Sequence, residues 1–246
     1  MSIVADRRSL NIAFKRIGET GLNLNGLIVG ILKNAKEFEY GIVIDREDQL
    51  ALGAFMGARL HQIYCDGRKL DKPNENGLNN NPRLKKLTDP MDAEFVEKVK
   101  SGEIEQSPTL FIDENGIVVM DIANTLFENL SPYWQNDNFK AGCAAARSVL
   151  TCYKLLRSKD ENVKKAVEYS VANAIHESWI ARGNIYYDVA GGNVYTNEDL
   201  ETAFINLSSD EKKKDVDHIY MAQALIDEIY KEMSMQNKGT VSGDDE

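Results

Sequence analysis

The chain has 246 residues, of which 43% are hydrophobic and 28% charged. These proportions are typical of a soluble globular protein with one large domain or two modest ones. Acidic residues outnumber basic ones by 39 to 29, for a formal net charge of −10. This excess argues against direct DNA or RNA binding, because contact with a phosphate backbone needs clustered positive charge.

Cysteine usage and hydropathy indicate a cytoplasmic protein. The three cysteines, Cys65, Cys143 and Cys152, are odd in number and lack CxxC spacing, which argues against a disulfide framework or a zinc site. The longest apolar runs, such as residues 27–32, are far shorter than the roughly 20 residues of a membrane helix. The first residues carry no apolar signal-peptide segment, so we expect no membrane association.

Residues 1–130 predict a mixed α/β region, which we assign to no family. In chain order, the apolar spacing predicts a short amphipathic helix at residues 7–17 and, around the apolar run 27–32, a segment at 24–35 that fits a buried strand or a buried helix. A strand at 38–45 and a helix at 46–64 follow. Residues 66–90 are rich in Asn, Gly, Pro and charge. They predict a long loop that forms a domain boundary or a lid.

A β-hairpin is predicted at residues 109–123, after a short helix at residues 92–102. Two apolar, β-rich runs flank Glu114, Asn115 and Gly116. An Asn-Gly pair tolerates the positive φ that a tight hairpin turn demands. We therefore predict an α+β fold, with a mixed N-terminal region that contains this hairpin and an all-helical C-terminal region.

Residues 131–236 carry helical patterns only. Ser131 and Pro132 form an N-cap and N1 pair that starts the first helix of this region. Its predicted inward face holds Phe139, Cys143, Ala146, Leu150 and Tyr153. Ser208 or Ser209 caps the last helix, whose apolar line is Ile219, Ala222, Ile226, Ile229 and Met233.

The middle helix starts at Asp160 and carries two parallel lines of residues. Apolar side chains recur every four positions at Val163, Val167, Val171, Ile175 and Trp179. Small side chains recur beside them at Ala166, Ser170, Ala174 and Ser178. The first line is predicted to face the core, and the second would let another helix approach closely. After the last helix, the polar and acidic residues 237–246 predict a disordered tail.

Catalytic and metal-binding motifs are absent from the sequence. It has no GxGxxG, GxxxxGK[ST], HExxH or GxSxG. His61 and Cys65 are four residues apart and could meet on a helix, but no third residue is placed to orient them. Cys143 and Cys152 fit core thiols. We therefore expect no cofactor and no metal ion, and the sequence does not support an enzymatic activity without excluding one.

The helix sequence "AIHESW", residues 174–179, is followed by an aromatic stretch, by Leu200 and Phe204, and by the sequence "LSSDEK", residues 207–212. This order resembles the RyR domain, the small helical module named for the ryanodine receptor and also found in bacterial and phage proteins. The similarity covers about residues 165–233. The resemblance implies a unit that binds a ligand or a protein, with nucleotide-like messengers as ligands in some bacterial members.

Five residues at the end of this helix and after it form a candidate ligand site: His176, Trp179, Arg182, Tyr186 and Tyr187. An arginine and aromatic rings together can hold a phosphate and stack on a base. Trp179 also continues the apolar line of the helix, and His176 also fits a structural histidine. Arg182, Tyr186 and Tyr187 lie at the helix end and in a loop, where such groups tend to recognise ligands.

These patterns together predict a cytoplasmic, non-enzymatic binding protein. It would recognise, or sequester, a small nucleotide-type ligand or a protein partner through the RyR-like module. The alternative is a structural or assembly protein that forms a homo-oligomer through its helical half, for example in a phage. A hydrolase that carries no known signature is a third hypothesis.

Overall fold

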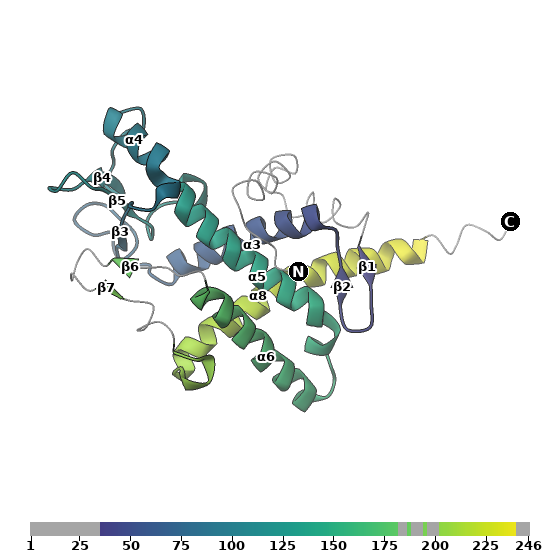
Figure 1. The fold of residues 1–246 in the computed structure, drawn as a ribbon. Coiled ribbons are helices and arrows are strands. Elements are labelled where there is room, and N and C mark those ends of the chain that lie inside the picture. The colour runs from purple at the N-terminus through teal and green to yellow at the C-terminus, as the bar shows by residue number, and fades with distance from the viewer. Residues whose placement is uncertain (1–34, 182–185, 188–193, 196–201, 240–246) are drawn as a thin grey trace. The chain divides into compact units, whose positions relative to one another are not determined.

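The computed structural model describes residues 35–181, 186–187, 194–195 and 202–239 (Figure 1). These residues form an α+β fold with small antiparallel sheets, as the sequence predicted. The mixed N-terminal region and the helical C-terminal region are both confirmed. Two short strands, β6 (Tyr186–Tyr187) and β7 (Val194–Tyr195), pair within the C-terminal region.

The α-helices of the described residues are α3 (Arg46–Asp66), α4 (Ala93–Ser101), α5 (Pro132–Leu156), α6 (Glu161–Ile180) and α8 (Ser209–Gly239). Their starts agree closely with the sequence predictions, because acidic first turns and capping residues mark them. The first residues of the predicted disordered tail are helical instead, since α8 continues to Gly239. Residues 240–246 lie outside the described residues.

Contacts along the chain define two compact units, each assembled from separated segments. Unit 1 consists of residues 1–56, 139–181 and 203–246, and unit 2 of residues 57–138 and 182–202. The helices α3 and α5 each contribute residues to both units. The units therefore do not coincide with the linear boundary at residue 130 that the sequence suggested.

The core of unit 1 is built by the inward faces of its helices. Its buried side chains include Ile44, Leu52, Met56, Val149, Leu156, Val171, Ile175, Phe204, Ile219 and Ile226. The helices α6 and α8 pack against each other, and the short 3-10 helix η3 (Phe204–Asn206) contacts α6. The predicted inward face of α5, from Phe139 to Tyr153, is buried throughout. The period of the apolar residues on α5 thus predicted its packing correctly.

The predicted core line of α6 is only half correct. Val171 and Ile175 are buried, whereas Val163 is 38% exposed. Each step of four residues turns about 40° around the helix axis, so Val163 lies about 120° away from Ile175. The small residues Ala166 and Ala174 are exposed as well. No neighbouring helix among the described residues therefore uses their line for a close approach.

The first described element of unit 1 is a small hairpin, whereas the sequence predicted one longer strand at residues 38–45. Its strands are β1 (Lys36–Glu37) and β2 (Ile42–Val43). The turn between them lies against α5, where a Cβ atom on Gly41 would come within 2.0 Å of the Leu150 carbonyl oxygen. Only glycine allows this approach. The elements predicted at residues 7–17 and 27–32 lie outside the described residues.

Unit 2 contains an antiparallel sheet with the order β3-β5-β4. The hairpin of β4 (Leu110–Ile112) and β5 (Val118–Asp121) confirms the prediction, and its turn residue Gly116 has φ +76°. Strand β3 (Leu84–Lys86) corrects the prediction that residues 66–90 form only a loop. The sequence of β3 has no β-rich pattern that would predict a strand. Its strand conformation comes from pairing with the buried strand β5.

The helix α5 starts at the predicted position in unit 2, but the side chain of Asp92, and not that of Ser131, accepts the hydrogen bond from its first turn. The Ser131 hydroxyl donates to Asp92 Oδ2 at 3.0 Å, and Asp92 Oδ1 accepts from the Tyr133 N–H at 2.8 Å. Asp92 therefore supplies the acceptor that the first turn of α5 needs. Burial raises the pKa of Asp92 to about 6, although the hydrogen bonds from Tyr133 and Ser131 oppose this rise.

None of the helices within the described ranges is long and apolar enough to cross a membrane.

Candidate functional site

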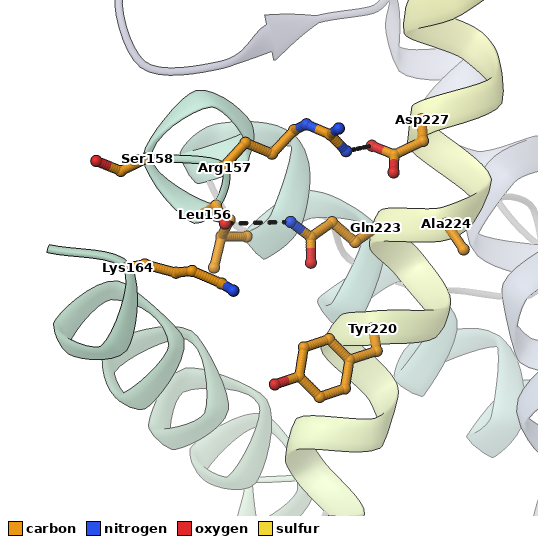
Figure 2. A pocket seen from close by; sticks show the side chains of 8 residues that line it. All are labelled: Leu156, Arg157, Ser158, Lys164, Tyr220, Gln223, Ala224 and Asp227. Carbon is orange, nitrogen blue, oxygen red and sulfur yellow. Dashed lines mark hydrogen bonds and ion pairs between the residues drawn. The ribbon is translucent and has the colours of Figure 1, made fainter. Parts of the chain in front are cut away.

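An open pocket of about 360 Å³ lies in unit 1, where the end of α5 meets α6 and α8 (Figure 2). It is lined by residues 156–158, by Lys164 of α6 and, on α8, by Tyr220, Gln223, Ala224 and Asp227. Small-molecule sites in proteins commonly have volumes of roughly 300–1,000 Å³. The pocket therefore has room for a ligand of nucleotide size.

Asp227 is the hydrogen-bonding centre at one side of the pocket. Its Oδ1 accepts from the Tyr153 hydroxyl at 2.6 Å and from Arg157 Nη1 at 2.5 Å. The hydrogen bond to Asp227 raises the pKa of Arg157 further above its ordinary value. This contact neutralises Arg157 locally and ties the end of α5 to α8.

Lys164 supplies the unused positive charge of the pocket. Its side chain extends from the first turns of α6 toward α8 (Figure 2). It is half-buried and makes no side-chain hydrogen bond or ion pair within the described part of the chain. A lysine ammonium has three donors and no acceptor. Lys164 is thus available to an anionic group that enters the pocket.

Tyr220 and Gln223 complete the α8 wall of the pocket. The Tyr220 ring is 49% exposed, and its hydroxyl donates to Glu168 Oε1 at 3.4 Å. Partial burial and the Glu168 carboxylate raise the pKa of Tyr220, so its hydroxyl stays protonated near neutral pH. Among the described residues, the Gln223 amide makes a single, long hydrogen bond of 3.4 Å to the Leu156 carbonyl oxygen. The wall therefore offers an aromatic face next to an adaptable polar group.

His176 and Trp179, two of the predicted site residues, belong to a packed cluster at the other end of the α6–α8 pair. His176 is 6% exposed, and its Nδ1 lies 3.4 Å from Asp215 Oδ2. Its ring stacks on Trp179 with centroids 5.7 Å apart and lies 5.9 Å from the Phe204 ring. These contacts favour the structural interpretation of His176 that the sequence left open.

The other predicted site residues are described only in part. Arg182 lies outside the described residues, and Tyr186 and Tyr187 are described as backbone of β6. Tyr186 pairs with Tyr195 and Tyr187 with Val194. These two tyrosines belong to unit 2, whereas His176 and Trp179 belong to unit 1. A common site of the five residues therefore stays a prediction.

His61 and Cys65 do meet on α3, within unit 2. The His61 Nε2–H group donates to the Thr125 carbonyl oxygen at 2.8 Å, and Cys65 Sγ lies 3.5 Å from the same nitrogen. Burial lowers the pKa of His61 and raises the pKa of Cys65 to about 11. Both groups are thus held in their neutral forms, which is the opposite of what an activated cysteine needs.

The described His, Cys, Asp and Glu side chains do not cluster as metal ligands. Over the residues that are described, no group of three or more His, Cys, Asp or Glu side chains is arranged to hold a metal ion. Cys143, one of the predicted core thiols, is buried, and Cys152 is half-buried. Burial raises the pKa of Cys143 to about 12. This thiol stays protonated at neutral pH and packs as an apolar group.

Comparisons of the chain with protein-family models, with curated proteins and with solved structures found no match. The resemblance of residues 165–233 to the RyR domain therefore stays a prediction. The pocket itself was not predicted, because its residues are distant in sequence and individually ordinary. One signal was available: Tyr220, Gln223 and Asp227 recur at helical spacing and put polar groups on one side of α8.

Proposed function

We propose that the protein is a non-enzymatic binding protein that takes a small nucleotide-type ligand into the pocket between the end of α5, α6 and α8. The observation that carries this proposal is the unpaired Lys164 ammonium in a polar pocket of about 360 Å³. Sequestering a signalling nucleotide is one use of such a site. We further propose that residues 165–233, which supply the α8 wall, form the RyR-like module.

Phosphate recognition would rest on Lys164. An anionic phosphate gains a charge-assisted hydrogen bond from the ammonium, which is stronger than a neutral one. The exposed Tyr220 ring gives a flat surface on which a base can stack. The overall charge of −10 repels anions at long range, so we expect the binding to depend on the local contacts of the pocket and to strengthen with added salt.

Calorimetry with mono-, di- and cyclic nucleotides tests this function directly. We expect at least one nucleotide to bind to the wild-type protein, and Lys164→Gln to weaken that binding about 10- to 100-fold, as loss of about 1.5–3 kcal/mol from a charged hydrogen bond implies. Lys165→Gln is the matched control, because Lys165 is exposed on the same helix and does not line the pocket. Binding that is equal in both variants, or absent in the wild type, would exclude this site.

A structural or assembly role is the second function we propose, and the outer face of α6 favours it. Val163 is 38% exposed, and the neighbouring Ala166, Ser170 and Ala174 are exposed as well. A second copy of the chain could pack closely against such a face. Light scattering over a range of protein concentrations tests this role: a Ser170→Arg variant should shift an oligomer to monomer. A wild-type monomer at every concentration would eliminate it.

A further inference from the structure

The pocket holds a second recognition element besides Lys164, namely the free oxygen of Asp227. The two hydrogen bonds that this carboxylate accepts, from Tyr153 and Arg157, both go to Oδ1. Oδ2 makes no hydrogen bond with the described residues, and the carboxylate is 36% exposed at the pocket wall. The Asp227 carboxylate is therefore fixed in orientation by its first oxygen and offers its second oxygen to a ligand.

The two ends of the pocket have opposite chemistry. Lys164 reaches in from α6 as a donor, while Asp227 lies on α8 as an acceptor (Figure 2). An ionised carboxylate can only accept hydrogen bonds, and an ammonium can only donate them. A ligand that satisfies both must carry an anionic group at one end and a hydrogen-bond donor at the other.

We propose that the pocket selects nucleotides whose base carries an exocyclic amino group, and that Asp227 Oδ2 accepts a hydrogen bond from this group while Lys164 holds the phosphate. This inference rests on the proposed function and adds the identity of the base to it. The exposed Tyr220 ring, about two helical turns before Asp227 on α8, supplies the stacking surface for the base (Figure 2). Asp227 is thereby the residue that determines specificity.

Bases with a carbonyl group at the same position are disfavoured for an electrostatic reason. A carbonyl oxygen that faces Asp227 Oδ2 would place two acceptors against each other. A site built to accept a hydrogen bond rejects an analogue without the donor, because its own polar group is then left without a partner. The pairs AMP and IMP, and CMP and UMP, each exchange an exocyclic amino group for a carbonyl at the same position and keep the phosphate unchanged. The adjacent ring nitrogen changes from an acceptor to an N–H donor, so the pairs test whether Oδ2 is placed against the exocyclic position itself.

Calorimetry with these four nucleotides tests the inference. We expect AMP to bind at least about 10-fold more tightly than IMP, and CMP more tightly than UMP by a similar factor. In an Asp227→Asn variant the preference should fall to near one or reverse, since an amide can also donate to a carbonyl. Asp217→Asn is the matched control on the same helix, because Asp217 pairs with Lys213 and does not line the pocket. The control should keep the wild-type preference.

The outcomes separate this inference from the proposed function. Equal affinities of the wild type for AMP and IMP and for CMP and UMP, together with weaker binding in Lys164→Gln, would overturn the inference and leave the function standing. Absence of binding for all four would overturn both. If Asp227→Asn does not fold, Tyr153→Phe serves as the second variant: it removes one bond to Oδ1 and keeps the carboxylate. Because Arg157 still holds Oδ1 in this variant, the preference should be retained, and equal affinities within each pair of nucleotides would overturn the inference.

Discussion

The two ends of the α6–α8 pair use the same kinds of side chain in different ways. At one end His176 contacts Asp215, Trp179 and Phe204. Of these four residues, all but Trp179 are buried. At the other end the polar groups of the pocket are partly exposed, and Lys164 has no hydrogen bond or ion pair within the described residues. A buried polar group must find its partner inside the protein. A partly exposed group can keep its capacity for a ligand. We therefore interpret His176 as a structural residue and propose Lys164 as a ligand-binding one.

Among the variants that test this comparison, Phe204→Ala should lower the free energy of unfolding the most. The Phe204 ring is 2% exposed and contacts His176 and Tyr169. Its removal leaves a cavity, and we expect the free energy of unfolding to fall by about 3–5 kcal/mol. Urea unfolding followed by circular dichroism measures this loss. A loss below about 1 kcal/mol would mean that the cluster is not part of the cooperative core.

Asp92 in unit 2 is a buried carboxylate that accepts hydrogen bonds from the neutral groups of Ser131 and Tyr133, whereas Asp227 accepts from the cation of Arg157. The pKa of Asp92 is raised to about 6 in the folded protein, above its ordinary value of 3.8. Folding therefore favours the protonated form, so stability should rise as the pH falls through 6 toward 4. The gain is about 3 kcal/mol.

The Asp92→Asn variant isolates this contribution from that of other carboxylates. An asparagine can still accept from the Tyr133 N–H, but it does not titrate. The stability of the wild type relative to Asp92→Asn should increase between pH 7 and pH 4, as measured by urea unfolding at each pH. A constant difference across this range would show that Asp92 keeps an ordinary pKa.

His176→Ala should give an intermediate effect. It removes the imidazole next to the buried Asp215 carboxylate, and we expect a loss of about 1–3 kcal/mol in the free energy of unfolding. Thermal unfolding with and without nucleotide measures both roles of the residue. Asn173→Ala is the control, since its exposed bond to Glu177 contributes little. Loss of nucleotide binding without loss of stability would show that His176 contacts the ligand and does not stabilise the fold. The distinction between the two ends would then be wrong.

Lys164→Gln should give the smallest effect on stability, below about 0.5 kcal/mol, because no hydrogen bond or ion pair among the described residues is lost. The same variant should lower ligand affinity strongly, as proposed above. Thermal unfolding without ligand provides the measurement. A destabilisation comparable to that of His176→Ala would indicate that Lys164 is structural, and the distinction between the two ends would fail.

Local sequence signals predicted the helices well. Asp160 accepts from the Asn162 and Val163 N–H groups at the start of α6, and Ser208 accepts from the Glu211 N–H at the start of α8. Such caps act within a few residues, so the sequence alone reveals them. Strand β3 was missed for the opposite reason, because its partner strand β5 lies more than 30 residues further along the chain.

The candidate site was predicted less well than the fold. His176 and Trp179 attracted attention as rare residue types, yet nothing local shows that Asp215 lies beside the histidine. Asp227 and Arg157 are 70 residues apart, and neither carries a recognisable motif. Their meeting depends on how α5 and α8 pack against each other. The spacing of apolar residues on one helix predicts which of its faces is buried, but not which helix covers that face.

The sequence by itself determined the α+β class, the helix starts and the hairpin turn at Gly116, because capping, periodicity and positive φ are properties of neighbouring residues. Only the tertiary structure decided which polar groups are satisfied. It buried His176 against Asp215 and left Lys164 and Asp227 Oδ2 at the surface of a pocket. The physical reason is that hydrogen-bond satisfaction depends on the three-dimensional arrangement of distant segments, which residue type alone does not reveal.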